Sequence, residues 1–159
     1  MALRHDALEV ARKFVGTREN PPGSNWGFWV SKFLASAGIK TPAPWCAAFV
    51  CYCYKVAGRP LTFPNRASVG YFQQWLEKNG YIVKRPLSGD VVCYNFDSDD
   101  WPDHMGIVDR VLAIRWKDGK FIGWIQVIEG NTSLTNQADG GRVMVRRRWA
   151  NRCKFGRIA

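Results

Sequence analysis

Three of the five cysteines of this chain lie close together in the stretch PAPWCAAFVCYCY, residues 42–54. The two prolines in this stretch favour an extended approach, and a helix that starts near Trp45 places Cys46 in its first turn. Unpaired backbone N–H groups and the partial positive charge of a helix N-terminus stabilise a thiolate, which is the reactive form of cysteine. This position favours Cys46 as a nucleophile.

The remaining cysteines have less reactive positions. Cys53 lies two turns deeper on the same helix face and Cys51 points elsewhere, so both are predicted to be small packing residues, as are Cys93 and Cys153. An odd number of cysteines in a chain expected to stay in a reducing cytoplasm argues against a disulfide framework. The spacing C-x4-C-x-C differs from the C-x2-C pair of ordinary zinc sites, which argues against a metal centre.

A thiolate catalyst needs a base, and the chain has two histidines. His5 falls in the first expected helix and is predicted to be an exposed bystander. His104 opens the strand-like segment DHMGIVDRV, from which its ring can reach the end of a neighbouring helix. We predict that His104 holds the proton of Cys46 and delivers it to a leaving amine; a purely structural histidine is the alternative.

A third residue is expected to orient the imidazole. In VIEGN (127–131), Glu129 and Asn131 flank a glycine at the end of an apolar strand. A hydrogen bond from His104 to Glu129 or to Asn131 would fix the tautomer of the ring, as the third member of a catalytic triad does. The other interpretation is a capped strand end or turn.

The elements that position these residues divide the chain into two halves. Helical spacing and glycine stops predict helices from Asp6, as N-cap, to Gly16, over about 26–37, from about Trp45 to Gly58, and over about 68–79. β-Branched and aromatic residues predict strands at 91–96, 104–112, 121–129 and 142–149, with a hairpin turn at 117–119. Helices followed by sequential strands predict an α+β domain over residues 1–159, with N-terminal helices packed on an antiparallel sheet.

Length and composition are typical of one folded domain: 159 residues, 47% hydrophobic and 23% charged. The longest apolar runs are too short to span a bilayer. The N-terminal segment MALRHDALEVARKF lacks the apolar core of a signal peptide, so we expect the protein to be made and left in a cytoplasm.

The net charge of +10 is concentrated in the basic segment 141–159, GRVMVRRRWANRCKFGRIA, which contains no acid. A basic surface attracts polyanions such as nucleic acid or anionic wall and outer-membrane polymers. A solvated face that aids solubility is the alternative.

Four motifs in this order, WCAAFV (45–50), SGDVVCY (88–94), DHMGIV (103–108) and VIEGN (127–131), resemble the CHAP domain. This family of cysteine, histidine-dependent amidohydrolases/peptidases is related to the NlpC/P60 enzymes. TRENPPGSN (17–25) is also similar to the lead-in of some members. The resemblance implies a papain-like fold and cleavage of peptidoglycan, either at the N-acetylmuramoyl-L-alanine bond or within the stem peptide or cross-bridge.

By position, the resemblance implies that Cys46 is the nucleophile, His104 the general base and Glu129 its orienting residue, with Asn131 assisting or substituting. The backbone N–H of Cys46 would form part of an oxyanion hole, and the second donor stays open. The candidate substrate-binding residues are Asn20, Asn25 and Trp45, of which either asparagine is a candidate second donor.

The acidic segment 96–104 precedes His104 and contains Asp97, Asp99 and Asp103 at a spacing faintly like that of a calcium loop. Some CHAP domains bind Ca²⁺, but this segment lacks the glycine and terminal glutamate of an EF-hand loop. We therefore expect that no cofactor is required, with Ca²⁺ at these three residues as the alternative.

Together these inferences predict a monomeric peptidoglycan hydrolase of the phage endolysin type, which reaches the wall after the membrane is permeabilised. Nucleic acid is not an expected partner. One alternative is an interbacterial amidase toxin with the same chemistry. Another is a non-catalytic basic module that binds wall or nucleic acid, in which tryptophans would serve as stacking platforms.

Overall fold

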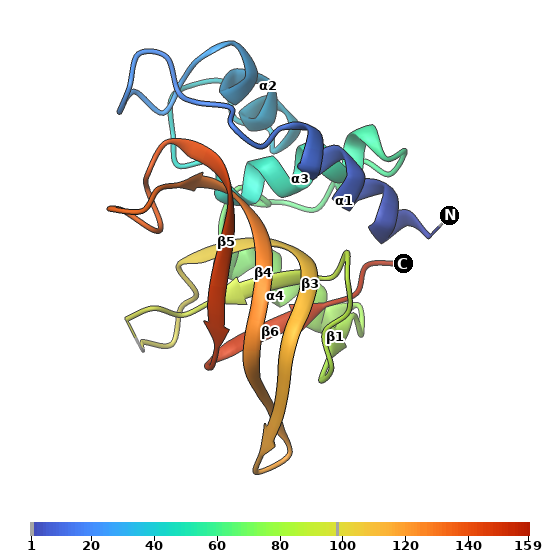
Figure 1. The fold of residues 1–159 in the computed structure, drawn as a ribbon. Coiled ribbons are helices and arrows are strands. Elements are labelled where there is room, and N and C mark those ends of the chain that lie inside the picture. The colour runs from blue at the N-terminus through green and yellow to red at the C-terminus, as the bar shows by residue number, and fades with distance from the viewer. Residues whose placement is uncertain (1, 98) are drawn as a thin grey trace.

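The computed structural model describes residues 2–97 and 99–159, and in that part of the chain four helices precede six strands (Figure 1). The helices are α1 (Leu3–Lys13), α2 (Phe28–Ser36), α3 (Cys46–Val56) and α4 (Val69–Lys78). The strands are β1 (Ile82–Val83), β2 (Val91–Tyr94), β3 (His104–Lys117), β4 (Lys120–Thr132), β5 (Arg142–Ala150) and β6 (Cys153–Gly156).

The strands form one antiparallel sheet in the order β1-β6-β2-β3-β4-β5. β6 therefore inserts between β1 and β2, although it follows all the other strands along the chain. β3 and β4 form a long hairpin whose turn lies far from α1, α2 and α3 (Figure 1). The architecture confirms the predicted α+β class and is consistent with a papain-like CHAP fold.

Three details differ from the sequence-based expectation. β3 and β4 are longer than predicted, so Glu129 lies inside a strand rather than at its end. β1 and β6 were not predicted, because two and four residues are too few to show an alternating pattern. Ala2, not Asp6, caps α1, since the Ala2 carbonyl accepts the N–H groups of residues 5 and 6; Asp6 lies in the first turn, where the helix dipole favours a carboxylate.

α3 is the central helix. Eight of its eleven residues are buried, as expected for a helix that is apolar on nearly all sides. β4 approaches its first turns closely at Gly130. A Cβ atom on Gly130 would lie 2.7 Å from Cβ of Phe49 and 2.9 Å from Cζ3 of Trp45. A side chain at this position would push β4 away from the start of α3, so the glycine permits the approach that forms the site.

The sheet separates two hydrophobic clusters. Along β2, Val91 and Cys93 belong to the cluster beneath the helices, whereas Val92 and Tyr94 belong to a second cluster on the other face, as the alternation of side chains along a strand requires. Within the described residues, no helix combines the length and the apolar character needed to cross a membrane.

Candidate active site

Cys46 is the first residue of α3, directly after Trp45, and is 6% exposed. No side chain caps this helix at Trp45. The backbone N–H groups of the first turn therefore receive no cap from the side chain of Trp45, and a helix N-terminus favours a negative charge near it.

His104, at the start of β3, is fully buried beside Cys46. Its Nε2 lies 2.9 Å from Oε1 of Glu129. Nδ1 has no hydrogen bond of regular geometry within the described residues, which leaves this nitrogen to face the Cys46 sulfur. Burial alone would lower the pKa of His104, but the Cys46 thiolate and the Glu129 carboxylate outweigh burial and raise it to about 9. The imidazolium form of His104 is therefore favoured beside these two groups.

Glu129 is held by a buried arginine from β5. Nε of Arg148 donates to Oε2 at 2.9 Å and Nη2 donates to Oε1 at 2.6 Å, which is a bidentate pair. Arg148 is 7% exposed, and its Nη1 donates to Oε1 of Gln137 at 2.7 Å. Burial would raise the pKa of Glu129, but hydrogen bonds from Arg148 and His104 outweigh it and lower that pKa. The carboxylate is therefore ionised when it meets the imidazole.

Two stacked aromatic rings flank the imidazole. The centroids of Tyr94 and Phe96 are 5.2 Å apart, and they lie 6.1 and 6.0 Å from that of His104. The Arg148 guanidinium lies over both rings, at 5.4 and 5.1 Å. These contacts exclude water from this side of the His104–Glu129 pair and so strengthen its electrostatic interactions.

The CHAP domain family model matches residues 38–131, more than half of the chain. The chain belongs to the CHAP family. No curated protein and no solved structure matches it. Membership confirms the resemblance expected from the motifs and indicates a peptidoglycan amidase or peptidase that uses cysteine and histidine. Arg148 lies outside the matched range, and sequence reasoning assigned it only to the basic segment 141–159.

Trp45 does not line this CHAP site, which corrects the prediction that it binds substrate. Its side chain is fully buried, and its indole N–H donates to Oε1 of Glu19 at 2.9 Å. Glu19 is 6% exposed, and its backbone N–H donates to the carbonyl of Gly141 at 3.0 Å. The lead-in segment 17–25 therefore supports the candidate site, because Glu19 fixes the side chain of Trp45, the residue that precedes Cys46.

Asn131 organises the loop between β4 and β5. Its Nδ2 donates to Oδ1 of Asp139 at 3.1 Å, and its Oδ1 accepts the N–H of Gly141 at 3.0 Å. Its backbone is left-handed, with φ of 56°, which asparagine tolerates better than most residues. Of the two candidates for the orienting residue, Glu129 is the one that contacts His104.

The two lead-in asparagines have separate positions. Asn20 is exposed, and its backbone N–H donates to the carbonyl of Trp26 at 2.9 Å. Asn25 is half-buried, with φ of 54°. Over residues 2–97 and 99–159, neither side chain hydrogen-bonds to the Cys46–His104–Glu129 row, so their substrate role stays a prediction.

The other cysteines are embedded in the core or the sheet. Burial raises the pKa of Cys51 and of Cys153 to about 12, and it also raises those of Cys53 and Cys93. These thiols are protonated at neutral pH, as packing residues should be. His5 is half-buried in α1 rather than exposed.

The three aspartates of the 96–104 segment do converge. One carboxylate oxygen from each of Asp97, Asp99 and Asp103 lies within 4.8 Å of the others. Each already accepts a backbone N–H of its own loop: Asp103 from Phe96, Asp97 from Asp99, and Asp99 from Trp101. These bonds hold the loop together, and Ca²⁺ at the three carboxylates stays the alternative prediction.

Proposed function

We propose that this CHAP protein hydrolyses an amide bond of bacterial peptidoglycan with Cys46 as the nucleophile. The observation that supports this most strongly is the row Cys46–His104–Glu129, in which a first-turn cysteine faces an imidazole bonded to a buried carboxylate. The bond is either the N-acetylmuramoyl-L-alanine amide or an amide of the stem peptide or cross-bridge. Both join a carbonyl to an amine, so one apparatus serves either.

In the proposed mechanism, the Cys46 thiolate attacks the carbonyl carbon, and backbone N–H groups at the start of α3 stabilise the oxyanion. The C–N bond then breaks as Nδ1 of His104 gives its proton to the leaving amine, which leaves a thioester on Cys46. A water molecule next gives a proton to His104 and attacks the thioester. This step releases the acid and restores the thiolate–imidazolium pair, while Glu129 keeps the ring in position.

We further propose an endolysin role, in which the protein is made in a host cytoplasm and meets the wall once the membrane is permeabilised. The net charge of +10 supports attraction to anionic wall polymers. Only part of the basic segment 141–159 is suited to this, because Arg148, Lys154 and Arg157 pair with acids of the fold. Arg142 and Arg147 are exposed.

Wall attraction is tested by substitution, since truncation from residue 146 would also remove Arg148 and β6. Arg142→Gln with Arg147→Gln should weaken sedimentation with sacculi more at low salt than at high salt, because salt screens exposed charges. The control is Lys13→Gln with Lys78→Gln, which removes the same charge elsewhere. Equal loss in both double variants would assign the attraction to net charge alone.

The hydrolytic activity is tested by mass spectrometry of purified sacculi after digestion by the wild type, Cys46→Ala and the control Cys153→Ser. We expect soluble fragments from the wild type and the control only. Muramic acid released from L-alanine would identify an amidase, and new stem or bridge termini an endopeptidase. Release by Cys46→Ala would refute the nucleophile, and no release by a folded wild type would refute the substrate.

A further inference from the structure

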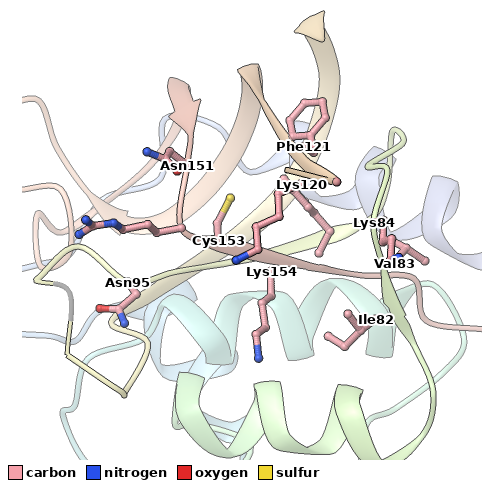
Figure 2. Close-up of a pocket in the computed structure, with 12 residues that line it drawn as sticks. Ile82, Val83, Lys84, Asn95, Lys120, Phe121, Asn151, Cys153 and Lys154 are labelled. Atoms are coloured by element: carbon pink, nitrogen blue, oxygen red, sulfur yellow. The ribbon is translucent and has the colours of Figure 1, made fainter. Parts of the chain in front are cut away.

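A pocket separate from the candidate active site opens between β1, the β3–β4 turn and β6 (Figure 2). Its volume is about 620 Å³, within the range of small-molecule sites. Three stretches that are distant in sequence line it, residues 82–84, 119–121 and 151–155, together with Asn95. We call it the basic pocket, because its lining contains four cationic residues and no acid.

The cations differ in how they are used. Lys154 leaves β6 towards α4, where its Nζ donates to Oε1 of Glu77 at 2.7 Å, so this charge is compensated. Lys120, at the start of β4, extends over the middle of the basic pocket, whereas Lys84 follows β1 on another wall (Figure 2). Arg152 completes the rim. A ligand in the pocket therefore meets lysines from two separate segments, 82–84 and 119–121.

The floor of the basic pocket is apolar. The rings of Phe121 and Phe155 meet edge to face with centroids 5.6 Å apart. Both belong to the second hydrophobic cluster, and Val83 and Cys153 pack against it. A hydrocarbon chain on this floor would extend an existing core, and each methylene removed from water contributes about 0.8 kcal/mol.

We propose that the basic pocket binds an amphipathic phosphate, an alkyl or prenyl chain that ends in a phosphate monoester. The apolar floor suits the hydrocarbon chain of the ligand, and the cationic rim suits its phosphate group. A phosphate monoester carries between one and two negative charges at neutral pH, which suits a lining that contains both Lys84 and Lys120, and lysine binds phosphate as a point charge. A carboxylate carries a single negative charge, so its electrostatic attraction to these lysines is weaker.

This site goes beyond the proposed hydrolysis and can be tested apart from it. Cys153 on β6 pairs with Tyr94 on β2, and Tyr94 pairs with His104 on β3. Neighbouring strands lie about 4.8 Å apart, so the inner end of the pocket is two strands, roughly 10 Å, from His104. Tyr94 stands between them, so ligand binding here needs neither the thiol nor the imidazole.

The test is calorimetric titration of the wild type with octyl phosphate, with inorganic phosphate and octyl glucoside as probes that carry only the head charge or only the chain. We expect saturable one-to-one binding of octyl phosphate and at least tenfold weaker binding of the other two. Lys84→Ala with Lys120→Ala should weaken octyl phosphate binding at least tenfold. Lys13→Ala with Lys117→Ala is the matched control, since it removes the same charge, and Lys117 pairs with Lys120 across the turn but does not line the pocket.

Several outcomes would overturn the proposal. These are no binding of octyl phosphate, equal binding of inorganic phosphate, or an equal loss in Lys13→Ala with Lys117→Ala. Near-UV circular dichroism verifies that each variant is folded, and chemical shift changes at Ile82 and Val83 locate the ligand. Sedimentation with phosphatidylcholine vesicles that contain phosphatidic acid then distinguishes the sources: lysine-dependent sedimentation indicates a membrane lipid, and its absence alongside octyl phosphate binding indicates a free ligand.

Discussion

Arg148 binds both carboxylate oxygens of Glu129, at 2.9 and 2.6 Å, inside the protein. The carboxylate thus binds both the guanidinium and the imidazole of His104. A buried carboxylate with only the imidazole would tend to take up a proton, and a protonated Glu129 would no longer favour the imidazolium. In the proposed mechanism, Arg148 is therefore a positioning residue, which acts on the reaction through Glu129.

We expect Arg148→Met to lower kcat/KM by about 10- to 100-fold, as loss of a supporting partner does at comparable sites. Stability should fall by about 3–5 kcal/mol, because one charge of a buried pair is left alone. Arg147→Met, its exposed neighbour, is the control and should change stability by about 0.5 kcal/mol or less. Adding Glu129→Gln to Arg148→Met should restore part of the stability without restoring activity. Wild-type kcat/KM in Arg148→Met would contradict this role.

The raised pKa of His104 predicts a loss of activity and stability in alkali. The folded-state pKa of about 9 exceeds the ordinary value of 6.5, so the stabilisation is fully present below about pH 6.5 and is lost as pH rises through 9. A shift of this size corresponds to about 3 kcal/mol. kcat/KM should fall above pH 9 for the same reason. In an NMR titration, the His104 ring of Cys46→Ala should titrate at lower pH than that of the wild type; an unchanged pKa would rule out the thiolate as a cause.

Alkylation should single out Cys46. At pH 7 iodoacetamide should modify Cys46 at least about tenfold faster than the other cysteines, whose pKa values are raised by burial. Peptide mass spectrometry over time measures this directly. His104→Ala should slow the reaction of Cys46 and leave the others unchanged. Equal labelling of Cys153, which is half-buried, would show that access rather than charge decides reactivity.

Glu19 should stabilise the fold through the hydrogen bond that its carboxylate accepts from Trp45. Glu19→Ala leaves the buried indole N–H of Trp45 without its partner, which costs about 1–3 kcal/mol. Thermal unfolding compared with Glu9→Ala, an exposed glutamate of α1, measures the difference. Because Trp45 directly precedes Cys46, Glu19→Ala should also slow alkylation of Cys46. A melting temperature equal to that of Glu9→Ala would show that water replaces the carboxylate.

Chelation should leave the enzyme unchanged. The carboxylates of Asp97, Asp99 and Asp103 already accept backbone N–H groups, so we expect EDTA to alter neither the melting temperature nor the release of wall fragments. Re-addition of Ca²⁺ or Mg²⁺ is the control. A drop in melting temperature that Ca²⁺ alone reverses would establish a calcium site in this loop.

The row Cys46–His104–Glu129 was predictable because each member shows a local signal. A cysteine opens a helix, a histidine opens a strand, and an acid interrupts an apolar strand. Arg148 shows none, since it is one of three consecutive arginines. Which of the three faces inward depends on the register of β5 against β4, in which Ile125 pairs with Arg148. Register follows from packing over the whole sheet.

The burial of the Trp45 side chain was also not predictable from local patterns in the sequence. Trp45 is adjacent to Cys46 in sequence and was predicted to bind substrate. In the structure its indole points inward to Glu19, a residue 26 positions earlier. A hydrogen bond between residues this far apart in sequence depends on how the lead-in segment 17–25 packs in the folded domain. The helices were predicted more accurately, because their spacing and stops are local.

The insertion of β6 between β1 and β2 sets an order of events during translation. β2 pairs with the strand that carries His104 on one side and with β6 on the other, so it stays an open edge until residues 153–156 have left the ribosome. Arg148 is also made after Cys46, His104 and Glu129. Cys46 and His104 are therefore synthesised before the strand that completes the sheet beside them, and the candidate site gains its full framework only once β6 has emerged.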